Sequence, residues 1–367
     1  MKKIILSGGG TGGHIYPAVA VAEELIRRYR DDIEILFVGA EGRMEMEKVP
    51  ALGYKITSLP IAGIQRRFDW HNIEVPFKLL KSITRAKRII KEFNADVVVG
   101  FGGYASAPIL WAAQHSGVPT IIQEQNSFAG LTNKILGRRA KRVCVAYDNM
   151  ERFFAHDKIV HTGNPLRGDF TKARLMRDEA RKHFNFDAQR PVVLVVGGSL
   201  GTRTLNEMMK SYILSLNGAA SPMQVIWQTG KFYQKEMVKF LEEHPTQGIW
   251  QGAFLENMNY AYGASDLVIS RSGACTVSEL CEVGLPTIFV PSPNVAEDHQ
   301  TKNAMALVNK GAALMVRDSE ATQKAMPLAL ETLRNSAQLR SLEEKIKALA
   351  TTNAAADIVN EIEKITK

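Results

Sequence analysis

The chain has 367 residues, of which 45% are hydrophobic and 23% are charged, so its composition is that of a globular protein rather than a disordered one. Its three cysteines fit no metal-ligand spacing and are too few for a disulfide framework, which favours a reducing, cytoplasmic setting. The absence of a long apolar stretch excludes a transmembrane helix and a signal peptide, and the formal net charge of +8 favours anionic partners.

Short apolar runs and amphipathic stretches alternate along the whole chain, which predicts two α/β domains built on parallel sheets. The expected strands are residues 3–7, 33–38, 55–59, 96–100, 119–123 and 141–145, then 191–196, 223–228, 248–251, 266–270, 286–290 and 312–316. The turn-forming segment Thr162–Gly168 separates the two patterns, so we expect domains at 1–163 and 164–349. An amphipathic helix at about 354–365 is expected to pack on either domain.

A glycine-rich turn, Gly8–His14, directly follows the first expected strand and precedes a helix. Such a turn brings backbone N–H groups and a helix N-terminus towards an anionic ligand. Its spacing also fits a dinucleotide-binding fingerprint, but that fingerprint needs an acid at the end of the second strand, where this chain has Val38-Gly39-Ala40. His14 is a candidate general base near neutral pH, and a helix cap or a packed histidine is the alternative.

The segment from Ile73 to Lys91 is expected to form a helix with two apolar stripes. The stripe expected to face the core consists of Leu79, Ile83, Ala86 and Ile90. The other consists of Ile73, Phe77 and Leu80, flanked by Lys78, Lys81, Arg85 and Arg88. An apolar stripe beside a basic one favours a helix that lies on an anionic membrane, and residues 61–70 add apolar side chains that we expect to be exposed. An ordinary solvated face is the alternative.

Polar clusters follow two later strands of the first half, at the strand ends where open α/β sheets bind ligands. Gly102-Gly103-Tyr104 follows residues 96–100, and Gln123-Glu124-Gln125-Asn126 closes residues 119–123. Amide and carboxylate side chains at these positions suit the hydroxyl groups of a sugar. Loops that bind no ligand are the alternative.

The second half begins with a similar glycine turn, Gly197–Gly201, and continues to the segment Arg271–Glu279, which opens a helix. Small residues at a helix N-terminus suit a diphosphate, and Glu279 could accept both hydroxyls of a ribose unless it is a solvated surface carboxylate. No Asp-x-Asp pair stands at a strand end, so we expect two helix N-termini, rather than a metal ion, to neutralise the diphosphate. Asp298-His299-Gln300 is a further polar loop in this half.

Six strings in this order closely resemble the MurG family of bacterial glycosyltransferases, over nearly the whole chain. They are Gly9–His14, Gly102–Tyr104, Glu124–Asn126, Thr162–Pro165, Gly197–Ser199 and Arg271–Glu279. The resemblance implies a GT-B fold: two Rossmann-like domains, a cleft between them, and a terminal helix at about 350–367 that returns to the first domain. It implies inverting transfer of N-acetylglucosamine from UDP-N-acetylglucosamine to the 4-hydroxyl of the muramoyl sugar of lipid I, which gives lipid II for peptidoglycan.

The resemblance also implies roles for single residues. Those implied to bind UDP-N-acetylglucosamine are Thr11, Gly12, Gly13, Asn126, Arg167, Ser199, Leu255, Ala274, Cys275, Thr276, Val277, Ser278, Glu279 and Gln300. Among them, Glu279 would hold the ribose and Leu255 the uracil edge, while Gly102, Gly103 and Tyr104 would lie on the acceptor side. His14 is the favoured catalytic base and Glu124 the alternative, and the sequence does not choose between them. The family often has two glutamines where this chain has His299-Gln300, so no contact is carried over to residue 299.

No cofactor or metal ion is implied. The expected partners are UDP-N-acetylglucosamine, lipid I, an anionic membrane met by residues 61–91, and other cell-wall synthesis proteins, but not nucleic acid. The expected location is peripheral, on the cytoplasmic face of the cell membrane. Four alternatives stay open: another GT-B transferase that uses a UDP-sugar, a UDP-N-acetylglucosamine 2-epimerase, a dinucleotide-dependent oxidoreductase, and a nucleotide sensor without catalysis.

Overall fold

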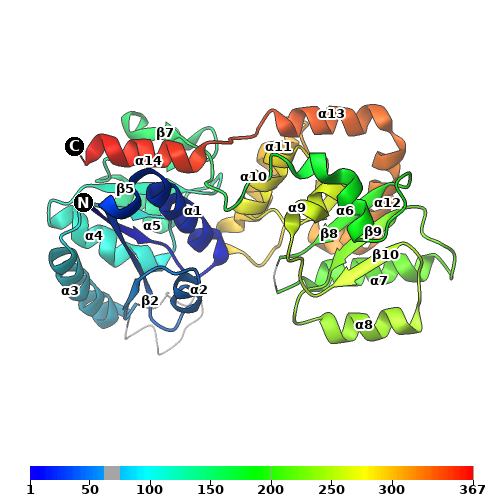
Figure 1. Ribbon diagram of the computed structural model, residues 1–367, viewed down its shortest axis with the longest axis horizontal. Coiled ribbons are helices and arrows are strands. Elements are labelled where there is room, and N and C mark those ends of the chain that lie inside the picture. Colours follow the sequence, from blue (N-terminus) through cyan, green and yellow to red (C-terminus); the bar gives the residue numbers. More distant parts are fainter. Residues whose placement is uncertain (62–74, 199, 367) are drawn as a thin grey trace. The chain divides into compact units, whose positions relative to one another are not determined.

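The computed structural model of the protein describes residues 1–61, 75–198 and 200–366. The chain divides into two compact units, the first made of Met1–Gly168 and Thr351–Lys367 and the second of Asp169–Ala350. Each unit contains one parallel sheet with helices packed on it (Figure 1). The predicted α/β class with two parallel sheets is therefore confirmed.

The sheet of the first unit has the strand order β3-β2-β1-β4-β5-β6-β7. The strands are β1 (Lys2–Ser7), β2 (Ile33–Ala40), β3 (Ile56–Leu59), β4 (Val97–Gly100), β5 (Thr120–Glu124), β6 (Arg142–Val145) and β7 (Ile159–His161). The sequence pattern does not predict β7, because this edge strand has three residues and none of them is buried. Since β1 pairs with both β2 and β4, the strand order reverses there, which creates a ligand-binding switch point at the carboxyl ends of β1 and β4.

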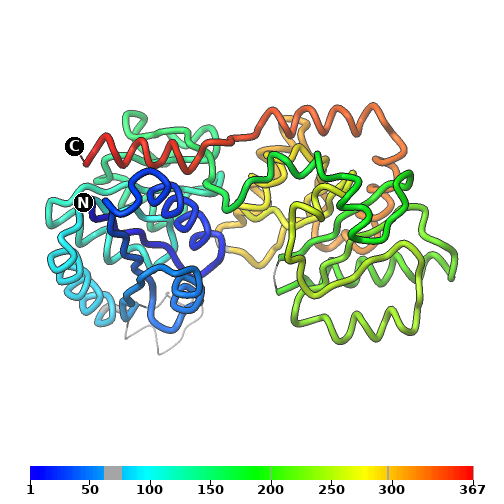
Figure 2. Tube along the Cα trace, viewed as in Figure 1, coloured from blue at the N-terminus to red at the C-terminus, as the bar shows by residue number. Residues whose placement is uncertain are grey.

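The helices of the first unit cover a core in which Ile4, Ile5 and Leu6 of β1 are completely buried. They are α1 (Gly12–Tyr29), α2 (Glu45–Ala51), α3 (Val75–Phe93), α4 (Ala107–His115), α5 (Leu131–Gly137) and α14 (Ala354–Ile365). The C-terminal helix α14 packs beside α1, as the red and blue ends of the tube show (Figure 2). Ile358, Val359 and Ile362 enter the core, and Arg28 of α1 pairs with Glu363 at 3.1 Å. These contacts attach the last segment of the chain to the first unit.

The two chain segments that leave the first unit lie against each other within it. Gly163 has a φ of 80°, and a Cβ added there would lie 2.6 Å from the Cβ of Thr351. Glycine is therefore required at this position for two reasons, backbone conformation and space.

The sheet of the second unit has the strand order β10-β9-β8-β11-β12-β13. The strands are β8 (Val192–Val196), β9 (Gln224–Gln228), β10 (Ile249–Gly252), β11 (Leu267–Ser270), β12 (Thr287–Phe289) and β13 (Leu314–Met315). The helices are α6 (Arg177–His183), α7 (Arg203–Ser215), α8 (Gln234–Glu243), α9 (Met258–Ala264), α10 (Ala274–Val283), α11 (His299–Val308), α12 (Ala321–Arg334) and α13 (Ser336–Lys347). Because β8 pairs with both β9 and β11, this sheet has its own switch point, at the carboxyl ends of β8 and β11.

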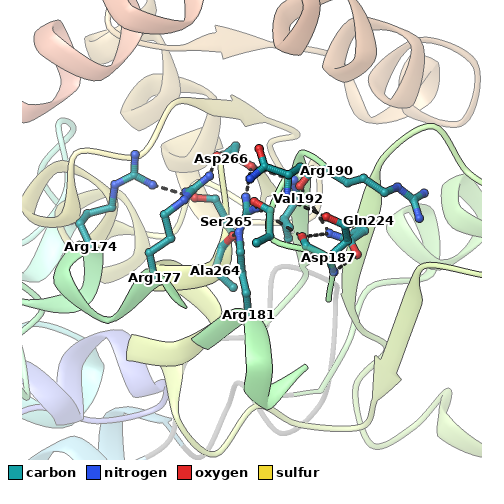
Figure 3. A network of polar contacts seen from close by, with 12 residues as sticks. Arg174, Arg177, Arg181, Asp187, Arg190, Val192, Gln224, Ala264, Ser265 and Asp266 are labelled. Atoms are coloured by element: carbon teal, nitrogen blue, oxygen red, sulfur yellow. Dashed lines mark hydrogen bonds and ion pairs between the residues drawn. The ribbon is translucent and has the colours of Figure 1, made fainter. Parts of the chain in front are cut away.

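A buried network of charged groups fixes α6 to the opposite, amino-terminal ends of β8 and β11 (Figure 3). Asp266 accepts hydrogen bonds from the Val192 N–H at 2.8 Å and from the guanidinium groups of Arg181 at 2.8 Å and Arg177 at 2.6 Å. The Arg181 side chain is only 3% exposed and also donates to the carbonyl of Ala264. Since this network lies at the far end of the strands from the switch point, we assign it a structural role.

Candidate functional site

The first glycine turn lies at the switch point of the first sheet, and a buried carboxylate reaches into it. Glu45, at the start of α2, accepts hydrogen bonds from the N–H of Gly10 at 3.0 Å and from the N–H of Ala40 at 3.0 Å. A side chain at Gly9 would overlap this carboxylate. The N–H of Gly10 is therefore occupied by an anionic group of the protein itself, and this turn does not offer it to a phosphate as a dinucleotide-binding turn would.

His14 lies in the first turn of α1 and faces the end of β5. Its backbone N–H donates to the carbonyl of Thr11 at 3.1 Å, and its Nδ1 lies 3.2 Å from the Oε1 of Gln125. Gln125 is 1% exposed. The structure thus brings together two predicted clusters, the glycine turn and the loop after β5, although they are more than one hundred residues apart.

The predicted acceptor-side glycines form a wall beside the His14 imidazole. Gly102 and Gly103 have φ angles of 91° and 76°. A Cβ added to Gly102 would lie 3.2 Å from Nδ1 of His14, and one added to Gly103 would lie 3.3 Å from its Cδ2. Tyr104 follows them, and burial raises the pKa of its hydroxyl, while the Arg43 guanidinium lies 5.9 Å from its ring centroid. Tyr104 is therefore a protonated hydrogen-bonding group at neutral pH.

Glu124, the alternative base, is buried and surrounded by hydrogen-bond donors. Its Oε1 accepts from the backbone N–H of Asn126 at 3.0 Å and from the side-chain Nδ2 of the same residue at 3.3 Å. Its Oε2 accepts from the N–H of Gly130 at 3.0 Å and from Nδ2 of Asn133 at 2.8 Å. These four hydrogen bonds hold the loop before α5 in place, so the geometry gives Glu124 a structural role in that loop. The predicted sugar contact Asn126 turns its side chain onto Glu124 in this structure.

Arg167, another predicted contact of the first unit, lies beside α1. Its guanidinium is 3.5 Å from the carboxylate of Glu23, and both side chains are about half exposed. The pair is therefore a surface ion pair of small energetic value, and Arg167 can exchange it for another anion at little cost.

The second unit contains a cavity of about 600 Å³ at the switch point of its sheet. The second glycine turn forms one side of it, with Gly197, Gly198 and Gly201 in its lining. Gly201 has a φ of 83° and packs directly on the backbone of Gly230, so a side chain does not fit there. Ser199, a predicted nucleotide contact, lies outside the described residues.

Four of the predicted donor-binding residues line this cavity: Leu255, Thr276, Glu279 and Gln300. Gly273, which immediately precedes α10, lines it as well, so the N-terminus of that helix opens onto the cavity. The other predicted residues of α10, which are not part of the cavity lining as the structure describes it, are Ala274, Cys275, Val277 and Ser278. Burial raises the pKa of the Cys275 thiol to about 12, so this cysteine stays protonated at neutral pH.

Burial perturbs the ionisation of Glu279, an acid of the cavity lining. Burial raises the pKa of its carboxyl to about 7, against an opposing hydrogen bond of 2.7 Å that the hydroxyl of Tyr262 donates to Oε2. Burial also raises the pKa of Tyr262, so its hydroxyl remains the donor. A ligand that donates further hydrogen bonds to Glu279 would stabilise the ionised carboxylate. Nothing in the sequence near Glu279 indicated Tyr262 as its partner.

Arg271 supplies a fixed positive charge to the same cavity. Its Nη1 donates to the carbonyl of Val290 at 2.7 Å and pairs with Oδ1 of Asp318 at 2.6 Å. Asp318 in turn accepts a hydrogen bond from the Thr204 hydroxyl at 3.1 Å. The sequence motif contained Arg271, but nothing in the sequence near Asp318 identified it as the partner of Arg271. The two residues are distant in the sequence, and folding brings them together. Across the described ranges, no three His, Cys, Asp or Glu side chains form a group able to hold a metal ion.

Gln300 is held at the cavity by two contacts. Its Oε1 accepts from the N–H of Ser292 at 2.8 Å, and its backbone carbonyl accepts from the hydroxyl of Ser272 at 2.8 Å. With Oε1 engaged, the amide presents Nε2 as the hydrogen-bond donor for a ligand. His299, for which no contact is expected, begins α11 and is not part of the described cavity lining.

The predicted membrane-facing helix is α3, and its apolar side chains are exposed as expected on one stripe. Phe77 is 73% exposed and Leu80 is 65% exposed. Two predictions were wrong in detail: Leu79 is 37% exposed rather than in the core, and Ile61 is buried in the core rather than exposed. Residues 62–74 of the predicted 61–91 surface lie outside the described residues. Within the described part of the chain, no helix is long and apolar enough to span a membrane.

Comparison with protein families gives a match in each unit. The glycosyltransferase family 28 N-terminal domain matches residues 4–145, and the glycosyltransferase family 28 C-terminal domain matches residues 192–362. The first match contains the His14 region, and the second contains the cavity with Glu279.

Full-length relatives share about half of their residues with this chain. The chain is 50% identical to the UDP-N-acetylglucosamine–N-acetylmuramyl-(pentapeptide) pyrophosphoryl-undecaprenol N-acetylglucosamine transferase of Parabacteroides distasonis, over 99% of this chain and 98% of that protein. It is 48% identical to the protein of the same name from Cytophaga hutchinsonii, over 99% of this chain and 96% of that protein.

Comparison with solved structures finds the same fold over nearly the whole chain. The crystal structure of Acinetobacter baumannii MurG superposes with a TM-score of 0.80 at 31% identity, and the alignment covers 99% of this chain and 100% of that one. A UDP-N-acetylglucosamine 2-epimerase from Neisseria meningitidis has a TM-score of 0.68 at 14% identity, over 99% of this chain and 100% of that one, a likeness that shows the fold alone.

Proposed function

The chain belongs to glycosyltransferase family 28 and, within it, to the MurG family, and on this premise we propose how its residues divide the reaction between the two units. The reaction is the transfer of N-acetylglucosamine from UDP-N-acetylglucosamine to the 4-hydroxyl of the muramoyl sugar of lipid I, the undecaprenyl-diphosphate-linked muramoyl pentapeptide. The product is lipid II, and the enzyme serves peptidoglycan synthesis and thereby cell shape and division.

The cavity of the second unit is proposed to hold the donor. Glu279 would accept hydrogen bonds from both ribose hydroxyls, which would compensate the desolvation that raises its pKa. The backbone at Leu255 would meet the uracil edge, and Nε2 of Gln300 would donate to the N-acetylglucosamine. The observation that carries this assignment is the placement of Glu279, Gln300 and a helix N-terminus around one cavity.

The departing diphosphate is proposed to be stabilised by the N-termini of α7 and α10 together with Arg271. The first turn of a helix has N–H groups that the helix does not itself use, and its dipole favours negative charge. Both helix starts and the Arg271 side chain line the cavity. Donors that are fixed before the reaction lower the barrier because they need no rearrangement as charge develops.

The first unit is proposed to supply the base, and the geometry favours His14 over Glu124. Glu124 accepts four hydrogen bonds, which hold the loop before α5 in place. His14 lies beside a glycine wall at the switch point and has an imidazole, a group suited to accept a proton near neutral pH. Gly102, Gly103 and Tyr104 would border the acceptor. The contacts of Thr11, Gly12, Gly13, Asn126 and Arg167 with UDP-N-acetylglucosamine remain predictions.

We further propose that the enzyme lies on the cytoplasmic face of the cell membrane, with α3 at the lipid surface. Exposed Phe77 and Leu80 are accompanied by exposed Lys81 and Arg85, the combination of apolar and basic groups that binds anionic membranes. This placement would bring the enzyme to its lipid-linked acceptor. Contacts with other cell-wall synthesis proteins remain a prediction.

Incubation with labelled UDP-N-acetylglucosamine, with and without lipid I, tests the function. We expect release of UDP and formation of labelled lipid II only when lipid I is present. Release with other UDP-sugar acceptors but not with lipid I would favour a different GT-B transferase. Reversible epimerisation of the donor without an acceptor would favour the epimerase alternative.

A further inference from the structure

A chain of buried side-chain amides ends at the His14 imidazole. Nε2 of Gln123 donates to Oδ1 of Asn164 at 3.0 Å, and Nε2 of Gln125 donates to Oε1 of Gln123 at 2.5 Å. Oε1 of Gln125 then lies 3.2 Å from Nδ1 of His14. All three amide side chains are at most 2% exposed, so water does not substitute for these bonds.

A backbone carbonyl determines the orientation of the Gln125 side-chain amide. Nε2 of Gln125 also donates to the carbonyl oxygen of Phe101 at 2.7 Å, and a carbonyl oxygen can only accept. If the amide were flipped, Oε1 would face two acceptor oxygens in a buried site without any donor, which is strongly unfavourable. Oε1 of Gln125 therefore faces the imidazole, and Nδ1 of His14 must be the atom that donates.

We propose that Gln125 is a positioning residue that holds His14 in the tautomer with its proton on Nδ1, so that Nε2 carries the lone pair for catalysis. The catalytic meaning of this inference rests on the proposed role of His14 as the base. The acceptor's 4-hydroxyl oxygen forms a bond to the anomeric carbon as the bond from that carbon to the diphosphate oxygen breaks, and UDP leaves with the electron pair. The hydroxyl proton moves to Nε2, and the resulting imidazolium keeps its Nδ1–H bonded to Gln125.

The glycine wall supports the same orientation of the ring. An added Cβ at Gly102 or Gly103 would lie within 3.3 Å of imidazole atoms, so the ring fits closely against these two residues. A ring turned by half a revolution would present a carbon atom, rather than Nδ1, to Gln125 and lose the hydrogen bond. The glycines thus restrict the plane of the ring, while the bond to Gln125 selects between its two flipped orientations and between its tautomers.

The tautomer can be measured directly by long-range proton–nitrogen NMR of the intact protein with labelled histidine, with His14 assigned from the spectrum of the His14→Gln variant. In the neutral imidazole, we expect Nδ1 to be the protonated nitrogen and Nε2 the unprotonated one. In Gln125→Leu, we expect the proton to shift towards Nε2. A proton on Nε2 in the natural protein, or an unchanged tautomer in Gln125→Leu, would overturn the inference.

Kinetics separate a positioning role from a merely structural one. We expect Gln125→Leu to lower kcat about 10- to 100-fold with little change in KM for UDP-N-acetylglucosamine. Gln125→Glu restores an acceptor for Nδ1–H but loses the two hydrogen bonds that Nε2 donates, so we expect it to recover only part of kcat. It should still move the acidic limb of the pH profile upward, since a carboxylate stabilises the imidazolium. An unmoved pH profile in Gln125→Glu would count against the proposal.

Gln114→Leu is the matched control. Gln114 is a half-buried amide of the same unit that donates to Leu136 and Thr120 and does not contact His14. We expect its substitution to leave kcat and the pH profile unchanged, and equal losses in the two leucine variants would contradict a specific role for Gln125. If His14→Ala retained full kcat while NMR showed the Nδ1–H tautomer, the base assignment would fail and the tautomer assignment would stand.

Discussion

We expect the pKa of Glu279 to depend on whether a ligand occupies the cavity proposed to bind the donor. The Glu279 carboxyl is half-buried in the cavity lining and accepts a hydrogen bond from the hydroxyl of Tyr262, and desolvation raises its pKa to about 7. A ribose that donates two more hydrogen bonds favours the ionised form and lowers this pKa. If Glu279 binds the ribose as proposed, we expect it to lose a proton near neutral pH when the donor binds.

This difference predicts that UDP binding depends on pH. Below pH 7 a proton must leave Glu279 before the ribose binds, so the Kd for UDP should rise up to about tenfold per pH unit as the pH falls. Calorimetry in buffers of different ionisation enthalpy should detect the released proton at pH 6.5 to 7, a window set by this pKa. Glu279→Gln should bind UDP more weakly at pH 8 and lose the dependence. Glu243→Gln, on α8 and outside the described cavity lining, is the control and should keep it.

The same group contributes to stability with a definite sign. Because its pKa in the folded state lies above the ordinary value of 4.5, its contribution to the free energy of unfolding is greatest below pH 4.5 and declines as the pH rises to 7. Glu279→Gln, which removes the charge, should therefore raise the Tm of the unliganded protein at pH 8 but not at pH 4.5. An equal effect at both pH values would contradict the burial of this carboxylate.

Among the single elements, the N-terminal ends of α7 and α10 are the ones on which the proposed stabilisation of the leaving diphosphate depends. Since helix N–H groups and Arg271 are proposed to stabilise the diphosphate, transfer should persist in excess chelator at close to the full kcat. The measurement is the rate of lipid II formation with and without chelator, followed by addition of magnesium. Complete loss of activity that magnesium restores would refute this account of the leaving group.

The proposed membrane binding depends on the exposed apolar side chains of helix α3. Burying an exposed Phe or Leu side chain is worth about 1.5–3 kcal/mol, so Phe77→Ser and Leu80→Ser should each weaken binding to anionic vesicles about tenfold or more. Cosedimentation with vesicles that contain anionic lipid measures this binding. Leu214→Ser on α7, where Leu214 is 50% exposed, is the matched control. Equal weakening by all three changes would contradict a specific role for α3.

The attachment of α6 depends on one buried ion pair. Asp266→Ala removes the acid that faces the 3%-exposed Arg181, and leaving such a charge unpaired costs about 3–5 kcal/mol. Arg177→Gln removes the 38%-exposed partner of the same acid and should cost less than about 1 kcal/mol. Denaturant unfolding measures both changes. Similar costs for the two variants would contradict the structural role of the Asp266–Arg181 pair.

At the scale of the whole molecule, the fold was predictable wherever burial leaves a pattern in the sequence. The central strands of both sheets are runs of apolar residues because they are covered on two faces, as in Val192–Val196. Strand β7 escaped prediction because, as a short edge strand, it has no buried residue. Leu79 was misplaced because periodicity identifies a stripe but not the length over which other elements cover it.

The site was predictable only where its residues follow strand ends. The glycine turns, His14 and Glu124 stand at such positions, and Glu279 lies in the helix that follows β11, so the sequence indicated them as candidates. Their partners Glu45, Tyr262 and Asp318 were not, because each reaches the site from a separate element. These contacts changed two interpretations: Glu45 shows that the first glycine turn is not a free phosphate cradle, and the donors around Glu124 favour His14 as the base.

The central claim is that the second unit binds the donor while His14 of the first unit removes the acceptor's proton. The most direct test is the kcat for lipid II formation in His14→Ala, measured together with the Kd for UDP. We expect kcat to fall about 10²–10⁴-fold while Kd stays unchanged. A kcat close to that of the natural enzyme, or a loss of UDP affinity in proportion to the loss of kcat, would contradict it.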